Sequence, residues 1–140
     1  LSELNGDLYI ARTFYDAEWN PAYGTSKISV GQVEQVNHVF AAGGACGGSV
    51  LTFNNKVYRS FDGGIAQIGD NLEIDGLNRI GDFNQSNVYH VEMIDGNILF
   101  AITDYGDLNQ IHVLDQNGNE IMQYEVGLTP GDFTSWHSSD

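Results

Sequence analysis

Hydrophobic and polar residues alternate with a period of two along most of the chain, and the apolar stripe of an amphipathic helix is almost absent. Residues that alternate in this way point to opposite faces of a β-strand, so each run predicts a strand. Short segments rich in Asn, Asp or Gly interrupt the runs, and these residues favour tight turns. The expected strands are 8–10, 28–30, 33–40, 50–53, 57–61, 65–68, 77–83, 88–94, 98–102, 111–114, 121–126 and 133–136. The pattern therefore predicts an all-β protein.

Three segments resemble one another and open on the same kind of turn: residues 5–10 (NGDLYI), 54–59 (NNKVYR) and 95–100 (DGNILF). Four short antiparallel strands in each 40 to 50 residues, roughly, are typical of β-propeller blades. We therefore predict one β-repeat domain over residues 1–140, with about three four-stranded antiparallel β-propeller-type blades at 5–53, 54–94 and 95–136. A two-sheet sandwich is the alternative, which explains the strands but not the repeat.

Three blades are too few for a closed ring, because propellers have at least about four. An open arc would leave apolar faces and strand edges uncovered. The expected architecture is thus an incomplete propeller or half of an oligomeric ring, and three interpretations stay open: a fragment of a larger propeller, a dimer that forms a ring, or an extended array. The chain begins at Leu1 and has no signal-type segment, which indicates a mature form or a fragment.

The chain also resembles the repeat of the YncE-like β-propeller family, which is seen in bacterial surface and periplasmic proteins that carry a domain of unknown function. The similarity rests on residues 56–58 (KVY), 111–115 (IHVLD) and 121–127 (IMQYEVG). It implies a secreted or envelope-associated binding module, and the family has no shared catalytic residues to carry over. The similarity does not extend to residues 16–23, where the chain carries an insert.

Composition excludes several classes of partner. The net charge of −14 repels phosphate backbones, so no nucleic-acid partner is expected. No apolar run reaches the roughly 20 residues of a membrane helix, so no transmembrane segment is expected. The single cysteine, Cys46, excludes an internal disulfide. Strong acidity with few lysines fits a secreted, periplasmic or cell-surface protein, and it fits the cytoplasm of a halophile almost as well.

An aromatic-rich insert at residues 14–23 (FYDAEWNPAY) is the main candidate for binding. Aromatic rings flanked by hydrogen-bond acceptors form surfaces on which sugars and protein partners stack. The expected binding residues are Tyr15, Asp16, Glu18, Trp19 and Tyr23, with Trp136 as a further contact on a C-terminal assembly strand. An ordered loop whose rings pack back onto the blade is the alternative.

Acidic residues recur after the first strand of each repeat, at Asp16, at Asp62, and at Asp104 with Asp107. Equivalent loops of a propeller lie on one face, so these carboxylates are candidate ligands for calcium or a sugar. Turn capping by Asp is the simpler explanation of the same residues. The four histidines, at positions 38, 90, 112 and 137, lack metal-binding spacing and are interpreted as strand-surface residues. No other cofactor is expected.

We therefore expect a non-catalytic β-propeller-type module that binds a protein or glycan, or that self-associates through its blade edges. Two alternatives stay open. Part of a propeller enzyme, hydrolase or quinoprotein-like, would bring several of Asp62, Asp104, His90 and His112 around one pocket. A structural subunit would assemble into a surface filament or layer.

Overall fold

The computed structural model describes residues 1–40 and 48–136, and this part of the chain is built from strands and short 3-10 turns without an α-helix. The first sheet comprises β1 (Ser2–Leu4), β2 (Asp7–Tyr15), β3 (Pro21–Ser29) and β4 (Gln35–Phe40). The second comprises β5 (Val50–Phe53), β6 (Lys56–Phe61) and β7 (Gly64–Ile68), followed by the 3-10 helices η1 (Gly76–Asn78) and η2 (Gln85–Asn87). The third comprises β8 (Val88–Ile94), β9 (Asn97–Thr103), β10 (Asn109–Leu114) and β11 (Glu120–Glu125). The predicted all-β fold is confirmed.

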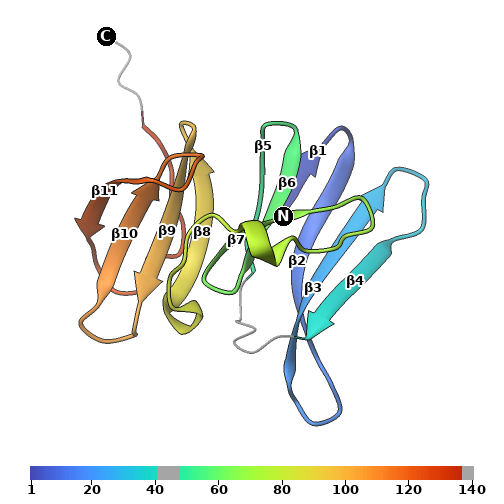
Figure 1. Ribbon diagram of the computed structural model, residues 1–140, viewed down its shortest axis with the longest axis horizontal. Coiled ribbons are helices and arrows are strands. Elements are labelled where there is room, and N and C mark those ends of the chain that lie inside the picture. Colours follow the sequence, from blue (N-terminus) through green and yellow to red (C-terminus); the bar gives the residue numbers. More distant parts are fainter. Residues whose placement is uncertain (41–47, 137–140) are drawn as a thin grey trace.

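Each sheet is an antiparallel meander, in which strands that follow one another in sequence pair directly. The three meanders stand beside one another in chain order, and the turns between first and second strands all lie along the upper edge of Figure 1. Strand β5 contacts both β1 and β8. The first strands of the three sheets are therefore neighbours, and the later strands of each sheet extend away from them.

The three repeated segments occupy equivalent places, each forming the first turn of a sheet and the strand after it. In the first and third sheets the turn residues Asn5-Gly6 and Asp95-Gly96 have φ values of 54° and 85°, and of 50° and 80°. Asn54 and Asn55 adopt 51° and 57° in the second sheet. Two successive positive φ angles define the tight turn that matches the twist of a hairpin, which Asn, Asp and Gly tolerate best. The repeat in the sequence is thus a repeat of turn chemistry.

The second sheet lacks a continuous fourth strand, so the strand predicted at residues 77–83 is wrong. Residues Ile74 and Ile80 pair with β7 only through isolated bridges, to Ile68 and Ile65. Between the bridges, the Asn78 side chain donates to the Asp75 carboxylate at 2.8 Å and the chain forms η1. Local hydrogen bonding by Asp and Asn competes with extended backbone, which explains the interruption.

Two further expectations are corrected at loops. The strand predicted at residues 133–136 is absent, since residues 126–136 have no regular structure after β11 and Pro130 and Gly131 interrupt any extended pairing. Half of the aromatic insert, at residues 14–15 and 21–23, is strand, because β2 and β3 pair continuously from Asp7 opposite Ser29 to Tyr15 opposite Pro21. Only residues 16–20 remain as a connecting loop.

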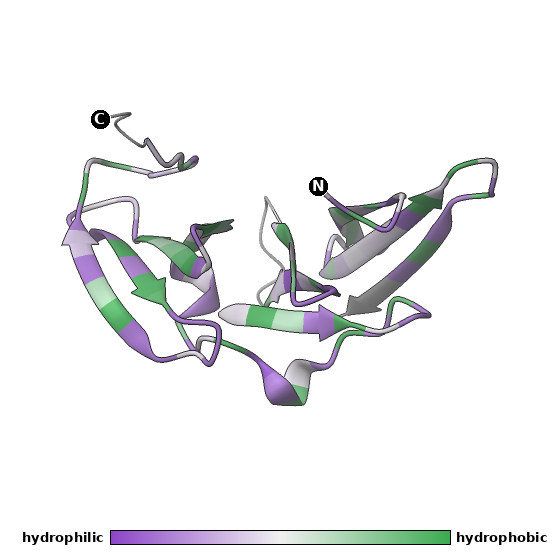
Figure 2. Ribbon diagram, turned by 90° about the horizontal axis from the view of Figure 1, so that it is seen from above, coloured by the Kyte–Doolittle hydropathy of each residue, from purple (hydrophilic) through white to green (hydrophobic). Residues whose placement is uncertain are grey.

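Two apolar clusters hold the sheets together. The cluster between the second and third sheets consists of Leu51, Tyr58, Ile65, Val88, Val91, Ile98, Phe100, Ile102 and Leu114. The cluster between the first and second sheets consists of Val50, Val57, Ile68 and Leu72, with Leu4, Tyr9 and Ala11 packed against it. Seen from above, the three sheets form an open arc and not a closed ring (Figure 2).

The outward faces of the first and third sheets are also apolar. Residues directly opposite each other in antiparallel strands share a face, and alternate residues point to opposite faces. Because Tyr9 and Ala11 pack toward the second sheet, their neighbours in β2 point away from it. The outward apolar residues of the first sheet are Leu8, Ile10, Ile28 and Val36. Those of the third sheet are Leu99, Ile111, Val113, Met122 and Tyr124.

Candidate functional site

A groove of about 210 Å³ lies between β5 and β8, where the second and third sheets meet. Its walls are Leu1, residues 48–51, residues 90–92 and Asp132. The groove therefore runs along neighbouring first strands, and the segment after β11 passes over one end of it. Segments from the beginning, middle and end of the chain meet here.

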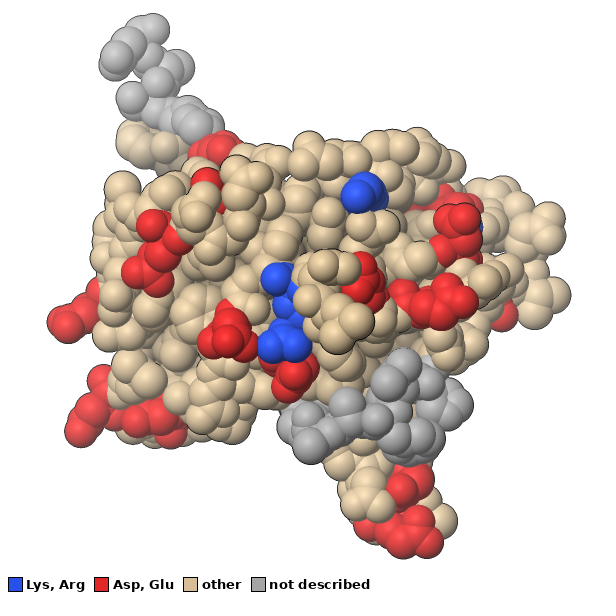
Figure 3. Space-filling view, viewed as in Figure 1, with Lys and Arg blue, Asp and Glu red and all other residues tan. Residues whose placement is uncertain are grey.

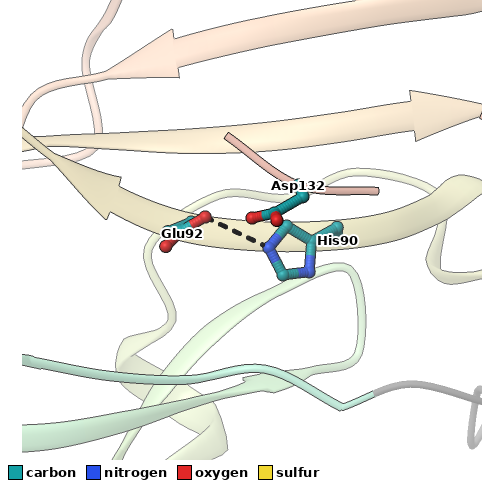
Figure 4. A group of neighbouring side chains, drawn as sticks. All are labelled: His90, Glu92 and Asp132. Carbon is teal, nitrogen blue, oxygen red and sulfur yellow. Dashed lines mark hydrogen bonds and ion pairs between the residues drawn. The ribbon is translucent and has the colours of Figure 1, made fainter. Parts of the chain in front are cut away.

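Three side chains with metal-binding atoms gather at this groove: His90, Glu92 and Asp132 (Figure 4). One ligand atom of each lies within 4.8 Å of the other two. The Nε2 atom of His90 is 3.4 Å from Oε2 of Glu92. His90 and Glu92 are two residues apart on β8 and so share a face, and the pairing of β8 with β9 shifts register between Val88 and His90. Such irregularities re-aim the side chains beside them.

Ser49 contacts the opposite side of the imidazole ring. Its Oγ lies 3.4 Å from Nδ1 of His90 and accepts the backbone N–H of Val91 at 3.1 Å. The backbone N–H of Ser49 donates to Oγ of Ser60 at 2.9 Å. The ring of Phe133 packs 5.7 Å from the imidazole, centroid to centroid. The imidazole is therefore held between a fixed hydroxyl group and the Glu92 carboxylate.

Ser49, His90 and Glu92 are the residue types of a hydrolytic Ser-His-carboxylate triad, but their arrangement does not favour that chemistry. Ser49 is buried, and its hydroxyl oxygen already binds the Val91 N–H. A nucleophile has to reach the substrate, and the oxygen of a buried hydroxyl that accepts a backbone bond is poorly placed for attack. The contacts fit a positioning role for Ser49 better.

The four carboxylates predicted as calcium or sugar ligands lie at the second turn of each sheet, along the lower edge of Figure 1. Asp16 and Asp104 each cap their own turn through Oδ1, which accepts two backbone N–H groups. Hydrogen bonds from Asn20 lower the pKa of Asp16. Asp62 pairs with Arg79 at 3.2 Å, and Asp107 is exposed. In the part of the chain that the structure describes, none of the four belongs to a three-ligand group.

Four of the predicted binding residues come together at the loop between β2 and β3. Trp19 is 78% exposed, and its ring lies 6.0 Å from that of Tyr15. Asp16 orders the loop by accepting bonds from the backbone of Glu18 and from both the backbone and side chain of Asn20. The loop thus presents an aromatic pair on a hydrogen-bonded frame.

The remaining two predicted binding residues lie elsewhere. Tyr23 is only 4% exposed, packs 4.8 Å from the ring of Phe61 and accepts the backbone N–H of Asp62 at its hydroxyl. It belongs to the core between the first and second sheets. Trp136 is exposed in the irregular segment after β11.

Of the histidines considered as ligands, only His90 joins such a group among the described residues. His112 pairs with Glu120 at 2.6 Å and packs against Phe83, so it does not converge with His90, Asp62 or Asp104. The histidines at positions 38 and 137 and Cys46 fall outside the described side chains. The one local signal for the groove was the His-x-Glu spacing at residues 90–92, because i and i+2 share a strand face.

Charge is distributed unevenly over the molecule. Acidic side chains are scattered over the face shown in Figure 3, and the few Lys and Arg side chains gather toward its centre. Several of the cations are paired: Lys27 with Asp7 at 2.7 Å, Arg79 with Asp82 at 2.9 Å, and Arg12 with Glu34. The surface is therefore strongly acidic outside these pairs.

No protein-family model and no curated protein sequence matches the chain. A search of the described residues for a helix long and apolar enough to span a membrane finds none.

Proposed function

We propose that this chain is a non-catalytic, β-propeller-type assembly module that completes its ring with a second copy of itself. Support comes from the arrangement of the sheets, which are meanders with neighbouring first strands, as propeller blades are. Two arcs of three blades related by a twofold axis would give six blades, a number common among propellers. The acidic composition supports a secreted or cell-surface location for such a ring.

The observation that carries this proposal is the pair of apolar outward faces at the two ends of the arc. Val36 of the first sheet is 47% exposed and Met122 of the third is 49% exposed, with further apolar residues beside each. Blades of a propeller pack face to face through such residues. In a twofold dimer, the first sheet of one copy would pack on the third sheet of the other, twice.

Charge opposes this association, because each copy carries −14. Apolar burial has to offset the repulsion, at about 25 cal/mol per Å² of apolar surface removed from water. Added salt screens charges farther apart than roughly 10 Å, so association should strengthen with ionic strength. Ionic strength is therefore a useful variable in the test.

The experiment is a mass measurement in solution by light scattering or sedimentation, at several protein and salt concentrations. We expect a species of twice the 15.4 kDa chain mass. Val36→Glu and Met122→Glu should each shift it to monomer, whereas Val30→Glu should not, because Val30 is 93% exposed beyond the end of β3. A monodisperse monomer under all conditions would refute the proposal. Masses that grow without limit would instead indicate the filament interpretation.

A second candidate function, carbohydrate binding, is favoured by the aromatic pair of Tyr15 and Trp19. Sugar rings stack on exposed aromatic faces, and the ordered loop reduces the conformational entropy lost on binding. Trp19→Ala should abolish binding to a glycan array, with Trp136→Ala as the control for loss of an exposed tryptophan elsewhere. Equal binding by wild type and the Trp19 variant would refute this function.

A further inference from the structure

We infer that His90, Glu92 and Asp132 form a binding site for one divalent first-row transition-metal ion, of the type of Zn²⁺, at the groove between β5 and β8. The site goes beyond the assembly function proposed above and does not depend on it. Its residues come from β8 and from the segment after β11, which also meet through the rings of His90 and Phe133.

The separation of the donor atoms fits such an ion. Zinc binds histidine nitrogen and carboxylate oxygen at about 2.0 to 2.2 Å, so two neighbouring ligand atoms of a tetrahedral site lie about 3.4 Å apart. The Nε2 of His90 and Oε2 of Glu92 are 3.4 Å apart. Asp132 brings the third ligand atom within 4.8 Å of both. Asp132 is exposed on an irregular segment, where its Oδ1 accepts the backbone N–H of Phe133 at 2.9 Å.

Ser49 is an independent observation that points to the same ion. Histidines that bind metals almost always form a hydrogen bond through the other ring nitrogen, which fixes the tautomer and the ring orientation. Here Nδ1 of His90 faces Oγ of Ser49, which is itself held by the Val91 N–H. The ring therefore directs Nε2 toward the Glu92 carboxylate, and Asp132 lies beside this pair.

The charges at the site favour a cation. Two carboxylates lie beside one imidazole. Among the described residues, neither carboxylate forms an ion pair with a Lys or Arg. The imidazole selects against calcium and magnesium, which prefer oxygen ligands, and favours zinc and its neighbours. Three protein ligands leave one coordination position, and the groove of about 210 Å³ gives water or a ligand access to it.

The test is titration of the full-length, metal-stripped protein with Zn²⁺ in competition with a chromophoric chelator, with Co²⁺ absorption as a report on coordination geometry. We expect one Zn²⁺ per chain and a Co²⁺ spectrum of tetrahedral type. Asp132→Asn and Glu92→Gln should each weaken Zn²⁺ binding by more than about tenfold, and Ser49→Ala by about tenfold through the loss of ring orientation.

Two variants serve as matched controls. His112→Gln removes a histidine that pairs with a single carboxylate, and Asp107→Asn removes an exposed carboxylate outside the group. Both should bind Zn²⁺ as the wild type does. Asp132→Asn changes no buried contact, so its circular dichroism spectrum should be unchanged, and its result stands even if Ser49→Ala folds poorly.

Three outcomes would overturn the inference. One is the absence of stoichiometric Zn²⁺ binding by the wild type. The second is equal affinity in the wild type, Asp132→Asn and Glu92→Gln, which would indicate adsorption to an acidic surface. The third is displacement of Zn²⁺ by equimolar Ca²⁺, which would exclude an imidazole ligand.

Discussion

Arg59 should be a net stabilising residue although it is a buried charge. It lies on β6 in the second sheet and is 1% exposed. Its Nε donates to the carbonyl oxygen of Ser60 at 2.9 Å, and its Nη1 donates across to the first sheet, to the carbonyl of Gly24 and, at 3.3 Å, to Oγ1 of Thr25. The guanidinium also lies 5.2 Å from the centre of the Tyr23 ring. Arg59 therefore ties two sheets together.

The magnitude follows from two opposing contributions. Burial lowers the pKa of Arg59 from its ordinary value to about 10, so the side chain is still charged at pH 7. At about 1.4 kcal/mol per pKa unit, this desolvation costs about 3 kcal/mol. Hydrogen bonds from a charged donor contribute about 1.5 kcal/mol or more each, or about 5 kcal/mol for three. The net contribution is therefore about 2 kcal/mol. Because the folded-state pKa is the lower one, the desolvation cost is present in full below about pH 10 and decreases above it.

Urea unfolding followed by circular dichroism, at one protein concentration, measures this contribution. Arg59→Met keeps most of the apolar stem and should lower the free energy of unfolding by about 2 kcal/mol, and Arg59→Ala by more, because it also leaves a cavity. Arg79→Met removes surface ion pairs and should cost less than about 1 kcal/mol. If Arg59→Met is as stable as the wild type or more stable, the reasoning is refuted, because the cost of desolvating the guanidinium would then equal or exceed the free energy gained from its hydrogen bonds.

Other substitutions test the turns by the same unfolding assay. Gly63→Ala should destabilise the fold by about 2 to 4 kcal/mol, because the φ of Gly63 is +81° and the added Cβ would overlap the carbonyl oxygen of Phe83. Gly6 has a similar φ of +85° but lies in open space, so Gly6→Ala should cost only about 1 to 2 kcal/mol. Equal costs for the two variants would show that the contact between Gly63 and Phe83 does not matter. Asn55→Gly should stabilise by up to about 1 kcal/mol, and a loss would contradict the turn assignment. Hydrogen bonds from Asn119 lower the pKa of Asp115 below its ordinary 3.8. The ionised carboxylate therefore stabilises the fold above about pH 4, and this contribution is lost as the pH falls through the folded-state pKa. Between about pH 6 and pH 3, the free energy of unfolding should depend less steeply on pH in Asp115→Asn than in the wild type.

Much of the strand content could be predicted because it depends on local chemistry. Alternation placed most strands within a few residues, and the turn at Asn5-Gly6 and its counterparts follow from the tolerance of these residues for positive φ. The prediction failed at residues 77–83 and 133–136, where apolar residues stand three positions apart and do not alternate with a period of two. Side-chain hydrogen bonding at Asp75 and Asn78 prevents a continuous strand in the first case, and Pro130 and Gly131 precede the second.

The aromatic loop was partly predictable, and the groove was not. Tyr15 and Trp19 were found because aromatic and acidic residues are close together in sequence, but the same pattern wrongly suggested that Tyr23 lies on the surface. Ser49 and Asp132 lie about 40 residues on either side of His90, and no local pattern relates residues so far apart.

The sequence alone determined the all-β class, the period of the repeat and the positions of the tight turns, because alternation and positive φ are properties of neighbouring residues. The tertiary structure decided which faces are covered. The packing of three meanders buries Arg59 and Tyr23, leaves Val36 and Met122 on uncovered faces, and brings His90 to Asp132. The burial of these side chains and the approach of His90 to Asp132 depend on contacts between sheets. Such contacts are set by packing across the whole fold and not by the neighbouring residues in the sequence.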